Sequence, residues 1–413
     1  MINLKGIPPV SQKNLAIQVT KQAQRKMRQG HPWLFDGGIV DQSFAGQSGD
    51  IAILFDQKRK FLAVGLYDPD SPIRVKMLSS GKPTKIDGDW FKKRLAESAA
   101  KRKHIEASGT TGYRVVYGEG DFLPGLIVDR YGDTLVIKIY SAAWFPHLAD
   151  ILAGLDAAVP SERQILRLSR NVQAGETWGL KDGTLLKGDM PDGPVPFIEN
   201  GLNFAADVVL GHKTGFFFDH RDNRQQVGQL AKHKRVLDVF AYTGGFSLYA
   251  AAGGASSVMS LDISQPALDA AVYNFDLNKA IRDVADCQHE TVAADAFNAL
   301  DNMSHTGRVF DLVIVDPPSF AKSQAEIELA VKAYAKLTRS ALKVLAENGV
   351  LVMASCSSRV SADLFYETVL DTAAESGRKL IEKSRFGHPA DHTVRPEFPE
   401  GNYLKCLIAT AVG

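Results

Sequence analysis

The chain of 413 residues is 45% hydrophobic and 23% charged, as in an ordinary globular protein long enough for two or three domains. No apolar stretch reaches the roughly 20 residues that a membrane-spanning helix needs. The start MINLKGIPPV lacks the apolar core of a signal peptide, so we expect a cytoplasmic protein. The cysteines (Cys287, Cys356 and Cys406) are too few and too scattered for a disulfide framework or a zinc site, and no metal is expected.

Charge is distributed unevenly along the chain. Residues 1–103 carry 19 Lys and Arg against 9 Asp and Glu, a net charge of +10. Because the whole chain carries 48 against 47, the remainder carries 29 against 38, a net charge of −9. A basic first third joined to an acidic remainder favours a segment that binds a polyanion. A basic, solvent-exposed face without a ligand is the alternative, and charge alone does not separate the two.

Residues 1–80 are predicted to form a small β-rich domain, because short β-type runs alternate there with turn residues (LAIQVT, DIAILFD, FLAVGLYD, IRVKML). Residues 81–190 are predicted to form an α+β domain with strands between Tyr113 and Ser141 and in QILRLSR. A helix over 145–157 is expected between these strands. A boundary rich in Gly, Pro and Asp follows near 183–195.

The basic segment 89–105 (DWFKKRLAESAAKRKHI) is predicted to be largely helical. Its Trp90, Leu95 and Ile105 are expected to be buried, and its Lys and Arg side chains, Arg102 included, to stay in water.

Residues 191–413 are predicted to form an α/β domain with a doubly wound parallel sheet. Strands alternate with helices in this region, and the strand runs are RVLDVF, SVMSLDI, HETVAA, FDLVIVD and GVLVMAS. The last two runs, KLIEKS and YLKCLIATAV, have no long helix between them and are expected to form an antiparallel pair at the sheet edge.

The first strand of this domain runs into a Gly-rich turn. The stretch from Asp238 to Gly244 matches the pattern D-x-F-x-x-x-G, in which the carboxylate can face the ammonium of a bound amino acid. The spacing is neither that of a dinucleotide fingerprint nor that of a P-loop, so the turn lacks the arrangement that a pyrophosphate requires. We therefore assign Phe240, Tyr242 and Thr243, with Asp238 and Gly244, to a cofactor-binding turn.

Carboxylates also follow the next strands. Asp262 ends the second strand, where it can accept hydrogen bonds from ribose hydroxyls, and Asp295 follows the third, where it can accept from an adenine amino group. Asp316 ends the fourth strand and is assigned to the cofactor site as well as to catalysis. A helix cap is the alternative for any one of them. Ribose, adenine and a zwitterion without a phosphate describe S-adenosylmethionine.

The segment GFFFDHRDNR precedes the cofactor turn. Arg221 is a candidate partner of the methionine carboxylate, and Phe217 and Phe218 are candidates for the wall of the site. A helix start with Asp219 as its cap and the phenylalanines in the core is an equal alternative.

Cys356 lies in SCSS, directly after the apolar run VLVMA, which is typical of a buried parallel strand. Asp316 opens DPPSF after the preceding strand. Ligands of open α/β sheets bind beyond the carboxyl ends of the strands, so thiol and carboxylate are predicted to face one site. A small buried hydrophobe is the alternative for Cys356, but its position opposite DPPSF favours a nucleophile. Cys287 and Cys406 are interpreted as structural.

Several motifs occur together: HPWLF, GEGDFLPGLIVDRYGD, KTGFFFDHRDNR, VLDVFAYTGGFSLYAAAGGA, VIVDPPSFAKS, SCSS and HPADHTVRPEFPEGNYLK. The set resembles the RlmI-type ribosomal RNA methyltransferases over the whole chain. The resemblance implies a PUA-like RNA-binding domain over 1–80, a linking domain over 81–190 and a class I, Rossmann-like methyltransferase domain over 191–413. It also implies methyl transfer from S-adenosylmethionine to cytosine C5 in large-subunit ribosomal RNA.

Cytosine C5 is a poor nucleophile, so the thiolate of Cys356 is expected to add to C6 and load electron density onto C5. Asp316 is expected to hydrogen-bond or protonate N3 or N4, Pro317 and Pro318 to stiffen the loop, and Phe320 to stack on a base taken out of its stack. Many RNA cytosine-C5 methyltransferases carry a second cysteine after the proline of this motif, where this chain has Ser319 after Pro318. The base that removes the C5 proton therefore stays open between Asp316 and an ordered water.

Other functions remain open from the sequence. A methyltransferase that acts on a guanine or adenine nitrogen also uses DPP followed by an aromatic residue, but it needs no thiol. An RNA-binding or assembly factor with a vestigial methyltransferase domain is the other alternative, and the intact set of aspartates argues against it. His388, His392 and Arg395 lie in a Pro-rich loop and are candidates for RNA contact. A homodimer is one option for the assembly.

Overall fold

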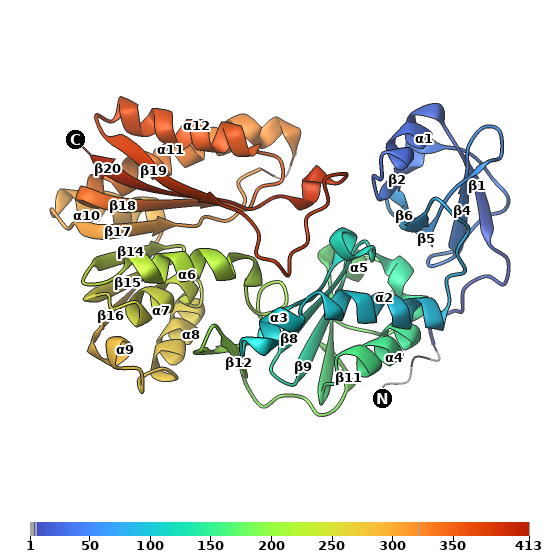
Figure 1. The fold of residues 1–413 in the computed structure, drawn as a ribbon, viewed down its shortest axis with the longest axis horizontal. Helices are drawn as coiled ribbons and strands as arrows, with labels where there is room; N and C mark the ends of the chain where they lie inside the picture. The colour runs from blue at the N-terminus through green and yellow to red at the C-terminus, as the bar shows by residue number, and fades with distance from the viewer. Residues whose placement is uncertain (1–3, 5, 322, 413) are drawn as a thin grey trace. The chain divides into compact units, whose positions relative to one another are not determined.

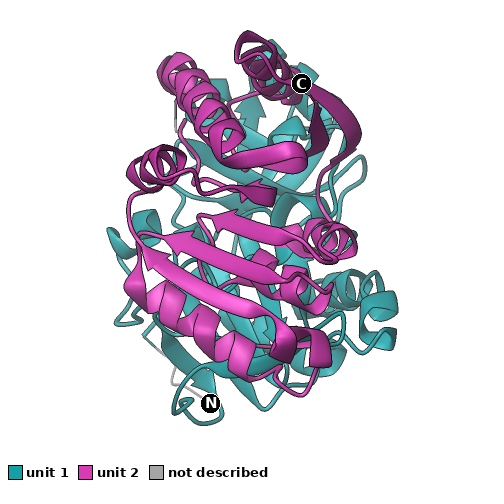
Figure 2. Cartoon of the chain, turned by 90° about the vertical axis from the view of Figure 1, so that its left-hand side faces the viewer, with its two compact units in different colours: residues 1–201, 206–218, 390–401 teal, residues 202–205, 219–389, 402–413 magenta. Residues whose placement is uncertain are grey.

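A computed structural model describes residues 4, 6–321 and 323–412. The chain divides into two compact units (Figure 2). Unit 1 comprises residues 1–201, 206–218 and 390–401, and unit 2 comprises residues 202–205, 219–389 and 402–413. The chain therefore leaves unit 1, builds most of unit 2, and returns to unit 1 with a short segment near its end.

The first sheet of unit 1 has six strands in the order β2-β6-β5-β4-β1-β3 (Figure 1). Its elements are β1 (Leu15–Val19), α1 (Lys21–Arg28), β2 (Trp33–Phe35), β3 (Ile39–Gln42), β4 (Ile51–Phe55), β5 (Phe61–Tyr67) and β6 (Ile73–Ser80). Alternating residues of β1 and β4 are buried, as expected for strands with one face on a core. The hydroxyl of Thr20 caps α1 by accepting a hydrogen bond from the Ala23 N–H.

The second sheet of unit 1 has five strands in the order β11-β10-β9-β8-β7. Its strands are β7 (Gly112–Tyr117), β8 (Leu126–Tyr131), β9 (Thr134–Ile139), β10 (Arg163–Leu168) and β11 (Thr184–Lys187). The helices are α2 (Gly88–Ala100), α3 (Lys103–Ala107), α4 (Leu148–Ala158) and α5 (Arg170–Gln173), and β12 (Val195–Glu199) follows. The basic segment that was predicted to be largely helical forms two helices, α2 and α3.

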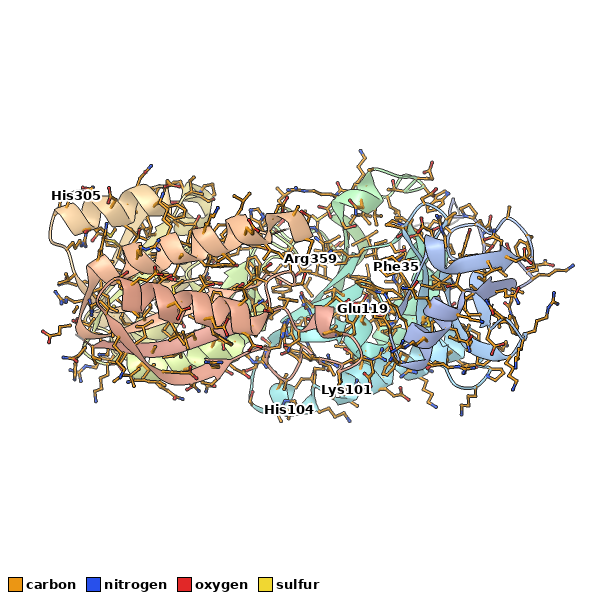
Figure 3. All side chains as sticks on the ribbon, turned by 90° about the horizontal axis from the view of Figure 1, so that it is seen from above. Phe35, Lys101, His104, Glu119, His305 and Arg359 are labelled. Carbon is orange, nitrogen blue, oxygen red and sulfur yellow. The ribbon has the colours of Figure 1, made fainter. Side chains whose placement is uncertain are left out.

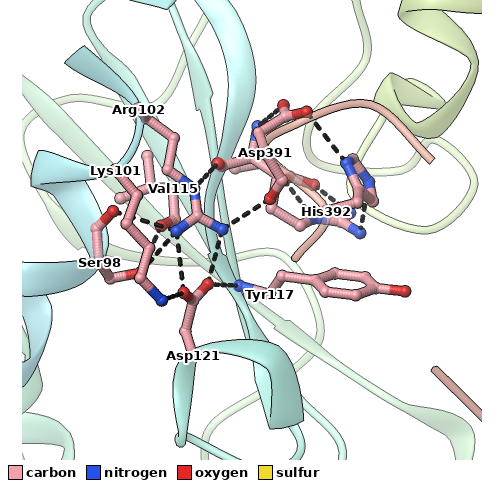
Figure 4. Close-up of polar contacts among 10 residues, drawn as sticks. Ser98, Lys101, Arg102, Val115, Tyr117, Asp121, Asp391 and His392 are labelled. Atoms are coloured by element: carbon pink, nitrogen blue, oxygen red, sulfur yellow. Dashed lines mark hydrogen bonds and ion pairs between the residues drawn. The ribbon is translucent and has the colours of Figure 1, made fainter. Parts of the chain in front are cut away.

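Arg102 lies between these two helices and is completely buried, so the prediction that it stays in water was wrong. Its guanidinium donates to both carboxylate oxygens of Asp121, at 2.9 and 2.6 Å, and to the carbonyl of Asp391 at 2.6 Å (Figure 4). Lys101 donates to the same carboxylate at 2.9 Å. A guanidinium is tolerated in a core only when it is paired and hydrogen-bonded, and the helical periodicity carries no information on such distant partners. Lys101 and His104, which lie close to Arg102 in the chain and are labelled in Figure 3, are exposed.

The returning segment 390–401 is held by the same part of unit 1. Asp391 accepts a hydrogen bond from the Arg114 N–H at 3.0 Å, and Arg114 Nη1 lies 3.0 Å from His392 Nε2. His392 is 2% exposed and packs against the ring of Tyr117 (Figure 4). Burial excludes the predicted RNA contact by His392.

Arg395 is also engaged within unit 1. It donates to the carbonyls of Glu119 and Gly30, and its guanidinium carbon lies 4.2 Å from the ring centroid of Phe122. These contacts give Arg395 a structural role, because its guanidinium joins segments that are far apart in the chain.

Unit 2 contains a seven-stranded sheet in the order β16-β15-β14-β17-β18-β20-β19, with helices on both faces (Figure 2). Its strands are β14 (Arg235–Val239), β15 (Ser257–Asp262), β16 (Gln288–Ala293), β17 (Phe310–Val315), β18 (Leu345–Ser355), β19 (Lys379–Phe386) and β20 (Lys405–Val412). Its helices are α6 (Arg221–Leu230), α7 (Gly245–Ala252), α8 (Gln265–Asp276), α9 (Arg282–Asp286), α10 (Ala296–His305), α11 (Ile327–Val344) and α12 (Ala362–Glu375). The short β13 (Leu202–Ala206) precedes them.

The first five strands of this sheet are parallel, and β20 pairs antiparallel with both β18 and β19. The predicted antiparallel pair is therefore present, but only β19 is at the edge, and β20 lies inside the sheet. Strand order reverses between β14 and β17, which is the switch point where open α/β sheets bind ligands. Among the described residues, no helix is both long enough and apolar enough to cross a membrane.

Candidate active site

The carboxyl ends of β14, β15, β17 and β18 bring most of the predicted site residues to one edge of the unit 2 sheet. The parallel register pairs Val239 with Leu261 and with Val315, and Val315 with Met353. Because the strands end within two residues of this register, the residues at or just after their ends share this edge. They are Phe240, Asp262, Asp316 and Cys356, with Asp238 one residue before the end of β14.

Asp238 is almost completely buried. Its Oδ2 accepts hydrogen bonds from the N–H and the hydroxyl of Ser247, at 3.0 and 2.7 Å, whereas its Oδ1 is buried without a partner. Burial raises the pKa of Asp238 to about 7 against the hydrogen bonds from Ser247, and the charges of Asp316 and Asp262 raise it further. A buried carboxylate oxygen without a partner is an acceptor suited to a cationic group of a ligand.

The turn after β14 has an unusual backbone. Phe240, Tyr242 and Gly244 have φ angles of 66°, 49° and 74°, and positive φ is uncommon for residues other than glycine. Such conformations persist where the surroundings over-determine them, often at ligand sites. A Cβ built on Gly244 lies 2.8 Å from the Cβ of Ala271, so the turn and α8 approach too closely for a side chain.

Asp262 supports this turn. Its Oδ2 accepts a hydrogen bond from the Tyr242 N–H and its Oδ1 from the Ser264 N–H, both at 2.9 Å. A carboxylate has about four acceptor positions, so each oxygen keeps one for a further donor.

Two other predicted cofactor residues lie near the turn and the next helix. The hydroxyl of Thr243 is buried without a partner, while its carbonyl accepts from Asn274 Nδ2 at 3.0 Å. Asp295 is exposed, and its Oδ1 caps α10 by accepting a hydrogen bond from the Asn298 N–H at 3.0 Å. The structure thus gives Asp295 the capping role that the sequence left as an alternative, with one carboxylate oxygen remaining.

Asp316 follows β17 and forms a pair with a histidine that the sequence analysis missed. His220 Nε2 lies 3.3 Å from Asp316 Oδ2. Burial acts to lower the pKa of His220, but the nearby Asp316, with a smaller contribution from Asp219, raises it above its ordinary value. The side chain of Asp316 is 24% exposed. A carboxylate at the surface of the site is thus backed by a buried imidazole.

The loop after Asp316 is partly buried. Pro317 is buried and Pro318 is exposed, so the loop has one residue in the core and one at its surface. Phe320 is partly buried and meets Tyr334 edge to face, with ring centroids 5.2 Å apart.

Cys356 follows β18 and is partly exposed, whereas Cys406 in β20 is completely buried. The preceding Ser355 is fixed by a hydrogen bond of 2.8 Å with the Tyr334 hydroxyl. The Nζ of the buried Lys405 donates to the carbonyls of Ser357 and Val360, at 2.5 and 2.9 Å. The loop that carries Cys356 is therefore held on both sides of the thiol.

Arg221 is the first residue of α6 and is 4% exposed, with its Nε 3.3 Å from Asp222 Oδ1. Phe218 is buried in unit 1, as the core alternative predicts. The predicted cap is wrong, because the N-cap of α6 is His220, and Asp219 instead accepts a hydrogen bond from the Tyr403 hydroxyl at 2.9 Å.

Sequence reasoning missed three residues of this region: His220, Ser247 and Lys405. Lys405 had a signal in the sequence, because it opens an otherwise apolar strand (KCLIATAV) where a charge is unexpected. His220 had none, because its partner Asp316 comes from an element distant in the chain. Ser247 lies close to its partner Asp238 in the chain, but no residue pattern marks the hydrogen bond between them. Among the described residues, no group of three or more His, Cys, Asp or Glu side chains could hold a metal ion.

The chain is similar to known methyltransferases over nearly its whole length. Residues 185–404, more than half of the chain, match the family model of S-adenosylmethionine-dependent methyltransferases, and residues 17–80 match the PUA-like domain. A "Ribosomal RNA large subunit methyltransferase" of Deinococcus radiodurans is 45% identical over 97% of this chain and 98% of its own length. A "Ribosomal RNA large subunit methyltransferase I" of Photobacterium profundum is 38% identical over 94% of this chain and 98% of its own length.

Solved structures share the fold. A methyltransferase complexed with SAH and an S-adenosylmethionine-dependent methyltransferase from Streptococcus mutans each have a TM-score of 0.81. Each is 24% identical to this chain and covers 96% of it and 99% of its own length. The predicted class I fold with an N-terminal PUA-like domain is confirmed, whereas the homodimer has no support. The chain belongs to the RlmI-type family of S-adenosylmethionine-dependent methyltransferases.

Proposed function

We propose that this protein methylates C5 of a cytosine in large-subunit ribosomal RNA through a covalent bond between Cys356 and C6 of the base. The observation that carries the proposal is the partly exposed Cys356 directly after β18, beside the strand β17 that Asp316 follows. The names of the relatives support ribosomal RNA as the substrate and, with it, a cytoplasmic location. We also propose the domain limits 1–80, 81–190 and 191–413.

The residues at the β14 turn fit S-adenosylmethionine, which supplies an electrophilic methyl group on a sulfonium. The unpartnered Oδ1 of Asp238 and hydroxyl of Thr243 are a buried acceptor and a buried donor or acceptor for the amino acid end. Asp262 keeps acceptor positions for the ribose hydroxyls. The remaining assignments, which rest on position alone, are Arg221 for the carboxylate, Asp295 for adenine, Asp316 beside the amino acid end, and Phe240, Tyr242 and Gly244 for the walls of the turn.

Cys356 begins the reaction as a thiolate whose sulfur bonds to C6, while the C5–C6 π electrons shift to C5 and the N3–N4 system. C5 bonds to the methyl carbon as the bond from that carbon to the sulfonium breaks. A base then removes the C5 proton, and the C5–H electrons re-form the double bond while the C6–S bond breaks. The sulfur leaves with its electron pair, so the thiolate of Cys356 is regenerated.

Asp316 and His220 form a pair of groups in this site that can hold a proton. A protonated Asp316 or its hydrogen bond to N3 or N4 stabilises the charge that builds up on the ring. When the C5 proton is released, Asp316 can accept it, and the buried His220, whose Nε2 lies 3.3 Å from Asp316 Oδ2, holds this carboxylate in place. Pro317 and Pro318 shape the loop beneath the base, and Phe320 offers an aromatic face next to it.

A basic groove in unit 1 is proposed to bind the RNA backbone. It has a volume of about 550 Å³ and lies between α1 and the turn after β4. Its lining contains Lys21, Arg25, Arg28 and Lys58 and a single acid, Asp56. Arg28 pairs with Asp56 at 3.2 Å, and Asp56 also accepts from the N–H groups of Lys58 and Lys60. The other cations of the groove remain for phosphates.

The test of the covalent step uses Cys356→Ala and an RNA fragment that contains the target cytosine. We expect Cys356→Ala to lose methylation while it still binds S-adenosylmethionine in calorimetry. With 5-fluorocytidine at the target, the wild-type protein is expected to remain bonded to the RNA on a denaturing gel, because fluorine on C5 cannot leave as a proton does. Cys287→Ala is the matched control and should behave as wild type.

A fully active Cys356→Ala protein would contradict the proposal. Methylation of a guanine or adenine nitrogen by that variant, identified by mass spectrometry of the nucleosides, would establish the alternative nitrogen methyltransferase. Such a transfer needs no thiol.

A further inference from the structure

Lys405 is a buried charge that the proposed reaction does not yet use. It is 4% exposed at the start of β20, where the antiparallel register places it opposite Ser355 of β18. Two of the three positions around its Nζ are occupied by the carbonyls of Ser357 and Val360. Both carbonyls belong to the loop that begins with Cys356.

The charge partner of the Lys405 ammonium is not the carboxylate that a buried lysine usually has. In the part of the chain that the structure describes, Lys405 forms no ion pair with a carboxylate, and its one charge partner is the sulfur of Cys356. A buried ammonium without an anion costs several kcal/mol in a typical protein core. Burial lowers the pKa of Lys405 to about 8, and Cys356 acts in the opposite direction. The site therefore tolerates the charge best when the thiol has lost its proton.

We propose that Lys405 is the positioning residue of the nucleophile: it holds the Cys356 loop through two carbonyls and stabilises the Cys356 thiolate with the remaining face of its amine. The proposal rests on the proposed role of Cys356. The proton balance is simple, since the Cys356 thiol releases its proton to solvent and the resulting thiolate lies beside the ammonium that Lys405 already carries. Neither an oxidant nor a further reactant is needed.

Other ionisable groups around this pair are consistent with the assignment. The Tyr334 hydroxyl of α11 interacts electrostatically with Cys356, and burial raises the pKa of Tyr334 to about 12, so it stays neutral near pH 7. Asp316 interacts with Tyr334 and with Cys406. Among these groups, Lys405 is the cation, and a cation favours the negative sulfur.

The experiment measures alkylation of Cys356 by iodoacetamide from pH 6 to pH 9.5, with the modified peptide quantified by mass spectrometry. Lys405→Met removes the charge, and Lys405→Arg retains it. We expect Lys405→Met to slow alkylation at pH 7 by about tenfold, the equivalent of about one pH unit in the titration of a thiol. Its titration should move to higher pH, and Lys405→Arg should stay near wild type. Cys287, whose pKa burial raises to about 11, is the internal control in the same sample.

The pH profile separates the charge from the support of the loop. A change of equal size at every pH would mean that Lys405 only orders the loop, and unchanged alkylation would mean that it does neither; both results overturn the proposal. Lys405→Gln also removes the charge but keeps a hydrogen-bond donor for the loop carbonyls. It replaces Lys405→Met in this experiment if Lys405→Met does not fold. Alkylation is measured without RNA, whereas the role of Cys356 is tested by RNA methylation in Cys356→Ala. The two measurements are independent, so a failure of the proposal for Lys405 is distinguishable from a failure of the proposed function.

Discussion

His220 Nε2 lies 3.3 Å from Asp316 Oδ2, and Asn223 Nδ2 lies 3.0 Å from the other ring nitrogen of the same histidine. The imidazole is 3% exposed, so a surface carboxylate of the site is coupled to a group that solvent does not reach. Asp316 is a residue of the proposed site that can exchange a proton, and His220 is its buried partner.

Replacing His220 by Gln is expected to lower the methylation rate by about 10- to 100-fold, because Asp316 loses its buried ion-pair partner. The measurement is a single-turnover rate against pH, and alkylation of Cys356 should stay unchanged. Asn223→Ala, which touches the ring but not the carboxylate, should have a smaller effect. An unaltered pH profile in His220→Gln would rule out a proton role for the pair.

Asp238 is expected to bind the cationic end of the cofactor, so Asp238→Asn should weaken S-adenosylmethionine binding by about 10- to 100-fold, the size of one charged hydrogen bond. The pKa of Asp238 is raised to about 7, so the wild type should lose affinity as pH falls from 7.5 to 6, whereas the variant should not. Titration calorimetry measures both. Asp301→Asn, an exposed carboxylate of α10, is the control.

The buried charge of Asp238 also has a cost for the empty protein. A carboxyl whose folded pKa is raised binds its proton more tightly when folded, so stability falls as pH rises from about 4 towards 7. Asp238→Asn should therefore raise the melting temperature of the cofactor-free protein at pH 8. A lower melting temperature there would contradict the burial of an unpaired charge.

Gly244 is expected to tolerate no side chain. Gly244→Ala combines a positive φ of 74° with a Cβ 2.8 Å from Ala271, and we expect it to destabilise unit 2 by about 3 kcal/mol and to abolish cofactor binding. Gly307→Ala is a matched control, because Gly307 has a φ of 69° but nothing within 4 Å of its added Cβ. It should cost only about 1 kcal/mol of backbone strain. Urea unfolding and calorimetry compare the two variants. Equal destabilisation would show that the contact of the added Cβ with Ala271 contributes nothing to the loss of stability.

The basic groove is tested with Lys21, Arg25 and Lys58 changed together to Gln, which leaves the Arg28–Asp56 pair intact. We expect weaker RNA binding, and a plot of log affinity against log salt whose slope is shallower by about one for each phosphate that the variant no longer neutralises. The rate at saturating RNA should be unchanged. Changing the exposed Lys279, Arg282 and Arg308 of unit 2 in the same way is the control for net charge. An effect of the same size in that control would remove the groove as the binding surface.

The residues alone were enough to predict the alternation of strands and helices in 191–413, and with it the strand ends that carry Asp238, Asp262 and Asp316. Such ends can be predicted because hydrophobic runs and the polar residues that follow them are local features. The position of Cys356 after VLVMA was predictable for the same reason. The excess of basic residues in the first third of the chain, some of which lie in α1, was also visible in the sequence. Their arrangement around a groove was not.

The partners of these residues became known only from the folded chain. Arg102 is buried because Asp121 and the carbonyl of Asp391, a residue from the far end of the chain, satisfy its guanidinium. His220 and Lys405 reach Asp316 and the Cys356 loop through long-range packing. Free energies of burial and pairing depend on such distant contacts, and no local pattern of residues encodes them.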